Sequence, residues 1–242
     1  MLLIDVGNSR IKAACSSNLE QSWAVTYQHG DRIAAIDLLL AQCKGQPGRV
    51  VLNCVNDQQS ADYVQRCSQQ IWGLDVDRLI ATDRFSGLVN GYAESGQLGV
   101  DRWCGLVAAW HQLQAPVIVV GCGTAITIDS VDKAGRHLGG VIFPGIRLAE
   151  ESFYGRTGNV QMESPVKRLI YADSTAAAVA SGVRWAVTGG INEQIKQLFV
   201  ELGGVSSVWL TGGDAAELKP YIDAETQILE SLVFQGMVLL AE

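Results

Sequence analysis

The stretch VIVVGCGTAITID, residues 117–129, has the pattern of two apolar strands joined by a tight turn at Gly123 and Thr124. A similar stretch, MLLIDVGNSRIKAAC, occupies residues 1–15 and turns at residues 7–9. Runs of aliphatic and β-branched residues predict buried strands, and glycine beside a hydroxyl or amide side chain is typical of turns. One strand–turn–strand pattern at the start of each half predicts a duplicated chain with two lobes.

Helical sequence follows the strands in both halves. Apolar residues recur at helical spacing over residues 101–113 and over much of residues 173–199, and Pro116 separates the two halves. The apolar stripe of the first of these helices could face a partner subunit as well as its own core. A repeated order of strands and helices predicts an α/β protein in which mixed sheets are flanked by helices. We expect two domains, with the boundaries 1–115 and 116–242.

The composition argues against two classes of partner. The chain of 242 residues has a net charge of −7 and lacks the basic stripe that nucleic acids require. No apolar stretch is long enough to cross a bilayer, and Asp5 interrupts the N-terminal apolar run before it could form a signal peptide. The six cysteines have no C-x-x-C spacing, which argues against zinc and redox sites. We expect a cytoplasmic protein that binds neither nucleic acid nor membrane.

Three glycine turns carry the groups that hold phosphate, namely backbone N–H groups, hydroxyls, a lysine and a carboxylate for hydrated magnesium. Each turn alone is compatible with an ordinary connection, but three in one chain favour phosphate binding. The chain has no G-x-x-x-x-G-K-[ST] loop, and Ile126 stands where a dinucleotide fingerprint needs its third glycine. The last of the three turns precedes a predicted helix, whose N-terminus favours anions. The turns are Asp5-x-Gly7-Asn8-Ser9-x-x-Lys12, Gly121-x-Gly123-Thr124-Ala125-x-Thr127 and Gly212-Gly213-Asp214.

The segment GVDRW, residues 99–103, places Asp101 and Arg102 at the start of a predicted helix. Aspartate at or near the N-cap is a common way to start a helix, which is one interpretation of Asp101. The other is that Asp101 is a general base that accepts a proton from a substrate hydroxyl. In that case Arg102 would bind a carboxylate or a phosphate.

Taken together and in this order, these motifs resemble those of the type III pantothenate kinases. The resemblance covers essentially the whole chain through DVGNSRIK, NGY, GVDRW, GTAITID, GGVIFPG, STAAAVASG and LTGGDA. It implies a duplicated, actin-like (ribonuclease H-like) ATPase fold. It also implies ATP-dependent phosphorylation of pantothenate to 4′-phosphopantothenate, the first step of coenzyme A biosynthesis, in a cytoplasmic homodimer that uses Mg²⁺ and a monovalent cation, K⁺ or NH₄⁺.

The resemblance also implies roles for individual residues. Asp101 would be the catalytic base, Asp5 would hold Mg²⁺ through water, and the region of Thr175 would reach the substrate site of the neighbouring subunit. The implied ATP-binding residues are Asp5, Val6, Gly7, Asn8, Ser9, Arg10, Ile11, Lys12, Gly123, Thr124, Gly212 and Gly213. The implied pantothenate-binding residues are Tyr92, Gly99, Val100, Asp101, Arg102 and Thr175.

The chain departs from the family pattern at Gly121, where the pattern Asp-x-Gly-Thr-Ala has an aspartate that helps to bind the monovalent cation. Asp129 lies eight residues further on, beyond a predicted strand. Carbonyl groups and water could hold the cation instead, or the cation dependence could be weakened. The same departure fits a non-catalytic regulator with the same fold. A sugar-type kinase of the same superfamily is a further alternative, against which the short chain and the GVDR segment count.

Overall fold

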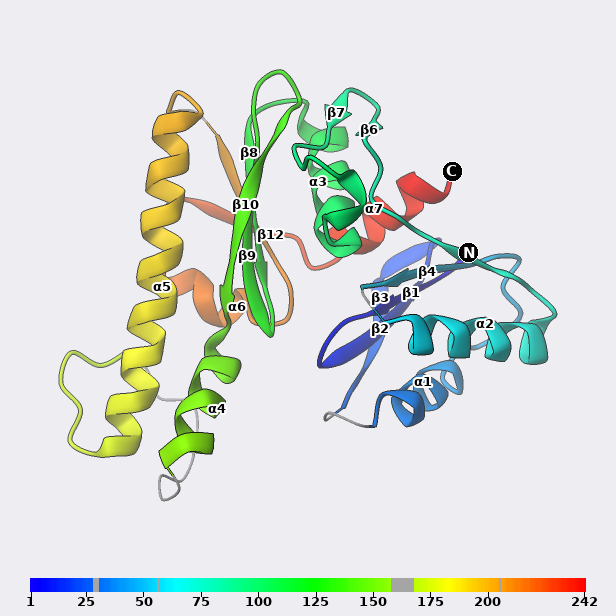
Figure 1. Cartoon of the computed structure of the whole chain (residues 1–242), viewed down its shortest axis with the longest axis horizontal. Helices are drawn as coiled ribbons and strands as arrows, with labels where there is room; N and C mark the ends of the chain where they lie inside the picture. The colour runs from blue at the N-terminus through cyan, green and yellow to red at the C-terminus, as the bar shows by residue number, and fades with distance from the viewer. Residues whose placement is uncertain (28–30, 56, 158–167, 205) are drawn as a thin grey trace. The chain divides into compact units, whose positions relative to one another are not determined.

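The computed structural model describes residues 1–27, 31–55, 57–157, 168–204 and 206–242. The chain forms two compact units (Figure 1). The first contains Met1–Ala115, Lys133–Leu138 and Glu230–Glu242, and the second contains Pro116–Asp132 and Gly139–Leu229. Two short segments of the C-terminal half therefore belong to the first unit.

The sheet of the first unit has the strand order β3-β2-β1-β4-β5. Strands β1 and β2 form an antiparallel hairpin, β3 continues the antiparallel arrangement, and β4 and β5 run parallel to β1. The predicted strand–turn–strand at the start of the chain is this hairpin. The bounds are β1 Leu2–Val6, β2 Arg10–Cys15, β3 Asn18–Thr26, β4 Val50–Cys54 and β5 Val76–Arg78.

Helices cover both faces of this sheet. Consecutive residues of a strand point to opposite faces, so neighbouring residues of one strand pack against different helices. Leu2 and Ile4 pack with helices α1 (Arg32–Leu40) and α2 (Gln58–Trp72). Leu3 packs on the other face with α3 (Val100–Leu113) and α7 (Leu232–Ala241) (Figure 1). A run of apolar residues without alternation is expected for a strand buried on both sides.

Helices α3 and α7 approach closely at one glycine. A Cβ atom on Gly236 would lie 1.9 Å from the carbonyl oxygen of Cys104, so only glycine allows this approach. The apolar stripe predicted for α3 faces the interior, since Trp103, Leu106 and Val107 have no exposed surface. The expectation that this stripe could also face a partner was wrong, because its residues are buried within the chain, with Trp110 the most exposed at 8%.

The sheet of the second unit repeats the first, with the order β10-β9-β8-β11-β12. Strands β8 and β9 are antiparallel, β11 runs parallel to β8, and β12 runs parallel to β11. Each sheet thus has a hairpin at its centre and two added parallel strands, which confirms the predicted duplicated fold of mixed sheets flanked by helices. The bounds are β8 Val117–Cys122, β9 Ala125–Val131, β10 His137–Pro144, β11 Ser207–Thr211 and β12 Thr226–Ile228.

One long helix, α5 (Thr175–Glu201), lies along the second sheet (Figure 1). Its residues Val183, Val187 and Ile191 pack with the sheet residues Ile118 and Val120. The same core includes residues from α4 (Ile146–Thr157) and α6 (Ala215–Leu218). The shorter elements are β6 Arg84–Phe85, β7 Leu88–Val89, and the 3₁₀ turns η1 Ser95–Gln97 and η2 Lys219–Tyr221.

Candidate active site

The first candidate group surrounds Asp5, near the end of β1. Asp5 stands opposite Lys12 of β2 on one side and opposite Asn53 of β4 on the other. Because paired residues of neighbouring strands point to the same face, these three side chains share one face of the sheet. The amide nitrogen of Asn53 donates a hydrogen bond of 2.7 Å to Oδ1 of Asp5. Asn53 is fully buried, and none of the sequence motifs singles it out.

Asp5 has a perturbed acidity. Burial and, to a lesser extent, the negative charge of Asp101 raise its pKa, Lys12 and the hydrogen bond from Asn53 lower it, and the net result is a pKa of about 6. Asp101 must therefore lie close enough to Asp5 for its charge to be felt. The fold brings together two carboxylates that are far apart in the sequence, as a site that binds a cation or transfers a proton requires.

The residues around Asp5 fit a hydrated magnesium ion. The side-chain oxygen of Asn53 is buried and has no hydrogen-bond partner, so a polar group or an ion would satisfy it. Two carboxylates that repel each other are stabilised by a cation. Within the described residues, no three Asp, Glu, His or Cys side chains form a metal cluster. Mg²⁺ keeps several of its waters and is usually bound through one or two carboxylates.

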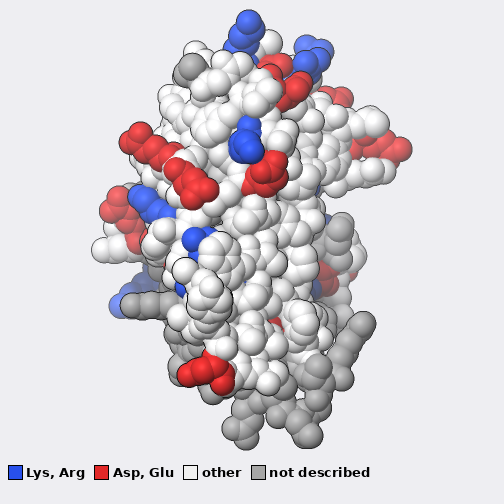
Figure 2. Space-filling model, turned by 90° about the vertical axis from the view of Figure 1, so that its left-hand side faces the viewer, with Lys and Arg blue, Asp and Glu red and all other residues white. Residues whose placement is uncertain are grey.

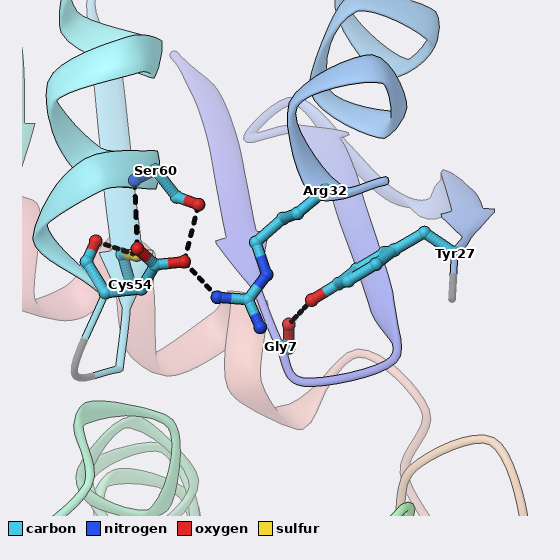
Figure 3. Close-up of polar contacts among 6 residues, drawn as sticks. Gly7, Tyr27, Arg32, Cys54 and Ser60 are labelled. Atoms are coloured by element: carbon cyan, nitrogen blue, oxygen red, sulfur yellow. Dashed lines mark hydrogen bonds and ion pairs between the residues drawn. The ribbon is translucent and has the colours of Figure 1, made fainter. Parts of the chain in front are cut away.

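The turn that follows β1 is tight and closed by backbone bonds. The N–H of Gly7 donates to the carbonyl of Arg10 at 3.1 Å. Tyr27 holds the other side of the turn, since its hydroxyl donates to the carbonyl of Gly7 (Figure 3) and its N–H donates to the carbonyl of Ser9. Asn8, at the tip, is exposed. This turn therefore offers fixed backbone groups and a polar side chain to a ligand.

Two residues of the predicted ATP-binding loop point away from solvent. Val6 and Ile11 are 3% and 0% exposed and belong to the core of the first unit. Their side chains anchor the hairpin, so only their backbone groups could contact a ligand. The motif from Asp5 to Lys12 thus contains residues that anchor the hairpin in the core, such as Val6 and Ile11, and other residues whose side chains could contact a ligand.

Asp101 lies in the first turn of α3, while the N-cap is Gly99. A Cβ atom on Gly99 would come 2.7 Å from Oδ1 of Asp101, so glycine leaves room for the carboxylate. A carboxylate in the first turn also favours the helix electrostatically. Its position therefore fits both interpretations of Asp101, and its role as a base stays a prediction. Val100, also predicted at this site, is the first residue of the helix.

Arg102 and Tyr92, each predicted separately to bind pantothenate, contact each other in the structure. Nη1 of Arg102 donates to the hydroxyl of Tyr92 at 2.9 Å, and the guanidinium carbon lies 5.6 Å from the centre of the ring. The backbone N–H of Tyr92 donates to Oδ1 of Asn90 at 3.0 Å. Asn90 in turn donates to the carbonyls of Thr82 and Ser95, so this buried amide holds the loop in shape.

His137 completes this group and was not identified from the sequence. Its ring stacks on that of Tyr92, with centroids 5.9 Å apart and an interplanar angle of 12°. It comes from residues 133–138, which belong to the first unit. Gly135 of this segment has a positive φ, and its carbonyl accepts from the N–H of Val89. Only the fold reveals this neighbour, since 45 positions separate the two rings in the sequence.

The second candidate group consists of glycine turns in the second unit. The N–H of Gly145 donates to the carbonyl of Thr124 at 2.9 Å, and a Cβ atom on Gly145 would lie 2.2 Å from the carbonyl oxygen of Gly123. Gly212, with a φ of 100°, approaches the carbonyl of Cys122 to the same degree. Two predicted turns and one further glycine thus meet at the end of β8. The exposed Gly213 follows Gly212.

Helix α6, which follows the Gly212 turn, has only four residues. We expected an anion-binding N-terminus here from the sequence, but one turn of helix has almost no aligned dipole to offer. We conclude that this helix dipole does not support anion binding. What the turn provides is the close approach of backbone to backbone at Gly212.

Arg184 of α5 ties together the helices that follow two of these turns. Its side chain is 6% exposed and pairs with Glu150 of α4 at 2.7 Å and with Glu217 of α6 at 3.0 Å. The Glu150 side chain is 12% exposed and that of Glu217 is 47% exposed, so the first pair is the more shielded from water. A buried arginine with two carboxylate partners fixes the helices relative to each other within this unit.

Comparison with known proteins decides the family. A family model described as type III pantothenate kinase matches residues 1–197. The chain belongs to this family. A type III pantothenate kinase of Alkalilimnicola ehrlichii is 32% identical over 245 residues, covering 99% of this chain and 97% of the relative. One of Nitrosospira multiformis is 31% identical over 241 residues, covering 100% of this chain and 90% of the relative.

Solved structures agree with the fold. A Campylobacter jejuni protein described as a conserved putative Baf family transcriptional activator has a TM-score of 0.62 and 24% identity, covering 99% of this chain and 96% of its own. A chain of the PilM–PilN type IV pilus biogenesis complex has a TM-score of 0.54 and 12% identity, covering 99% of this chain and 97% of its own. At these identities the likeness concerns the fold. Among the described residues, no helix is long and apolar enough to span a membrane.

Gly121, where the resemblance implies an aspartate, lies in β8 opposite Thr127 of β9 and Thr211 of β11. A Cβ atom on Gly121 would come 2.5 Å from the hydroxyl of Thr127, so that side chain takes up the space an aspartate would need. The φ of Gly121 is not positive, and its backbone accepts other residues. Asp129 is buried opposite Val119, about 7 Å further along the strand.

Thr175 is the first residue of α5 and is exposed. The N-cap is Ser174, whose hydroxyl accepts from the N–H of Ala177 at 3.2 Å. Thr175 belongs to the second unit, whereas Tyr92, Asp101 and Arg102 belong to the first. Its predicted role at the substrate site of a neighbouring subunit stays a prediction.

Proposed function

We propose that this protein transfers the γ-phosphate of ATP to the primary hydroxyl of pantothenate and forms 4′-phosphopantothenate, the first step of coenzyme A biosynthesis. The observation that carries the proposal is the pair of carboxylates Asp5 and Asp101, which the fold brings together beside a glycine turn. The family model matching residues 1–197 supports the same substrate.

Each member of the first group has a role in this reaction. Asp101 accepts the proton of the pantothenate hydroxyl as that oxygen attacks the γ-phosphorus and the bond to the bridging oxygen of ADP breaks, a contribution of about 10²–10⁴-fold in rate for a general base. Arg102, oriented by its hydrogen bond to Tyr92, pairs with the carboxylate of pantothenate. Lys12 and the backbone N–H groups of the turn at residues 7–9 hold the phosphates of ATP.

Magnesium would bind through water at Asp5, with Asn53 as a further oxygen donor, and would offset the charge of the phosphates. The glycine turns around Thr124 would bind the nucleotide through their backbone groups. At Gly121 a carboxylate ligand for the monovalent cation is missing, so K⁺ or NH₄⁺ would be held by carbonyl, hydroxyl and water oxygens and with lower affinity. The activity would then need more of either cation than a relative with aspartate does, or be nearly indifferent to both.

We also propose a homodimer, for which the exposed apolar residues of the second unit are the support. Large apolar side chains on β10, α4, α5 and the segment before α5 are 40–91% exposed, and the face that carries α5 has few charged residues at its centre (Figure 2). Apolar side chains that gather on one face mark protein interfaces, and a homodimer would bury those of this unit. Light scattering at assay concentration tests this, and a monomeric mass would refute it. The residues are Ile142, Leu148, Phe153, Ile170, Tyr171 and Trp185.

The experiment that tests the function is an ADP-release assay with pantothenate, with mass spectrometry of the product, at several K⁺ and NH₄⁺ concentrations and constant ionic strength. The wild-type protein should form phosphopantothenate, and Asp101→Asn should lose at least about 100-fold in kcat while keeping its circular dichroism spectrum. A wild-type protein that binds ATP but forms no phosphopantothenate would support the regulator alternative. An Asp101→Asn variant within a few-fold of wild type would exclude Asp101 as the base.

A further inference from the structure

Tyr27, directly after β3, holds both sides of the turn that follows β1. Its hydroxyl donates to the carbonyl of Gly7 at 2.5 Å, and its backbone N–H donates to the carbonyl of Ser9 at 3.1 Å. The side chain is almost entirely buried. Burial also raises the pKa of the Tyr27 hydroxyl, which therefore remains a donor at neutral pH.

The bond to Gly7 determines where the next N–H group points. No cis peptide bond occurs in the part of the chain that the structure describes. In a trans peptide the C=O and the following N–H point in opposite directions. Because Tyr27 holds the carbonyl of Gly7 (Figure 3), the geometry of the trans peptide directs the N–H of Asn8 away from Tyr27. Fixed N–H groups in tight glycine turns are what anions such as phosphate bind.

Tyr27 is itself held in place by a charged pair. The guanidinium of Arg32 lies 5.3 Å from the centre of the Tyr27 ring and forms an ion pair with Asp57 (Figure 3). Asp57 is the N-cap of α2 and accepts from the N–H and the hydroxyl of Ser60 at 3.0 and 2.6 Å. The turn is thus connected, through Tyr27 and Arg32, to the start of a helix that is part of the core.

We propose that Tyr27 is a positioning residue for ATP, whose hydroxyl keeps the Gly7–Asn8 peptide in the orientation that binds phosphate. This inference rests on the proposed function for the identity of the ligand. Glycine places little restriction on its own backbone, so without the hydroxyl the peptide at Gly7 can rotate. ATP would then bind to a smaller population of the correct conformation, which weakens binding without removing any group that touches the ligand.

The test compares Tyr27→Phe with Tyr63→Phe, which removes a hydroxyl from α2 that donates to Asp37 at 2.7 Å. Both changes delete one oxygen and keep the ring. Tyr27→Phe should raise the Kd of a non-hydrolysable ATP analogue, measured by calorimetry, and the KM for ATP by about 3–10-fold, the effect of one neutral hydrogen bond. The KM for pantothenate at saturating ATP should change less than about twofold, and Tyr63→Phe should change neither constant.

A second variant guards against poor folding of Tyr27→Phe. Asp57→Asn keeps a good N-cap but removes the charge that holds Arg32, and it should raise the Kd of the analogue by about twofold. An unchanged Kd in a folded Tyr27→Phe variant would overturn the inference, as would an equal rise in both KM values. If wild-type protein fails to phosphorylate pantothenate while Tyr27→Phe still weakens analogue binding, the proposed function fails and this inference stands.

Discussion

Replacing Asp5 by asparagine should make the free protein more stable while removing its activity. The carboxylate of Asp5 has a pKa of about 6 in the folded protein against 3.8 for the ordinary side chain. Between these two pH values the folded state binds more protons than the unfolded state, so stability falls as the pH rises through this window. At pH 7.5 the ionised Asp5 costs the folded protein at most about 3 kcal/mol, because each tenfold change in acidity corresponds to about 1.4 kcal/mol.

Asparagine has the same shape and can still accept the hydrogen bond from Asn53, but it carries no charge near Asp101. Because Asp5 is partly open to solvent, we expect a gain of about 1–3 kcal/mol in the free energy of unfolding at pH 7.5, or roughly 2–8 °C in melting temperature. At pH 4.5, where wild-type Asp5 is largely protonated, the gain should be smaller by about 2 kcal/mol at the upper limit. The kcat/KM for ATP should fall by at least about 100-fold.

Thermal and urea unfolding of both proteins at pH 4.5 and 7.5, without magnesium or ATP, measure this difference. Asp62→Asn, on the exposed side of α2, is the matched control and should change stability little at either pH. A variant that is less stable than wild type at pH 7.5 would refute the reasoning. So would a stability difference that is the same at both pH values, because titration of Asp5 could not then be its cause.

Three further substitutions probe the remaining groups. Arg102→Lys should raise the KM for pantothenate by about 10-fold or more and change the KM for ATP little, since lysine lacks the planar fork that pairs with a carboxylate; equal effects on both constants would contradict this role. His137→Ala removes the ring that stacks on Tyr92 and should raise the KM for pantothenate by about 2–10-fold, whereas His137→Phe should keep it near wild type; the same loss in both variants would count against stacking. Gly121→Asp should sharpen the activation by K⁺ only when it is combined with Thr127→Ala, because the threonine hydroxyl takes up the space of the new side chain. If the wild type is already tightly activated by K⁺ and neither change alters this, Asp129 becomes the residue to test as the cation ligand.

The fold could be predicted from the sequence to the extent that it depends on local patterns. Apolar runs around Gly7 and Gly123 specified two hairpins, because strand and turn preferences act over a few neighbouring residues. The helical stripe at residues 101–113 specified a helix, but not what covers it. Which face of α3 is buried depends on α7, from the other end of the sequence, so the surface we expected it to expose lies in the interior.

The sequence by itself determined which residue types could do the chemistry, since its motifs contain the carboxylates Asp5 and Asp101 and the positively charged side chains Lys12 and Arg102. Only the tertiary structure decided how these groups affect one another. The raised pKa of Asp5 and the orientation of the Gly7 peptide by Tyr27 result from contacts between segments far apart in the chain. Such contacts depend on how complete elements pack, and local sequence patterns carry no information about distances between them.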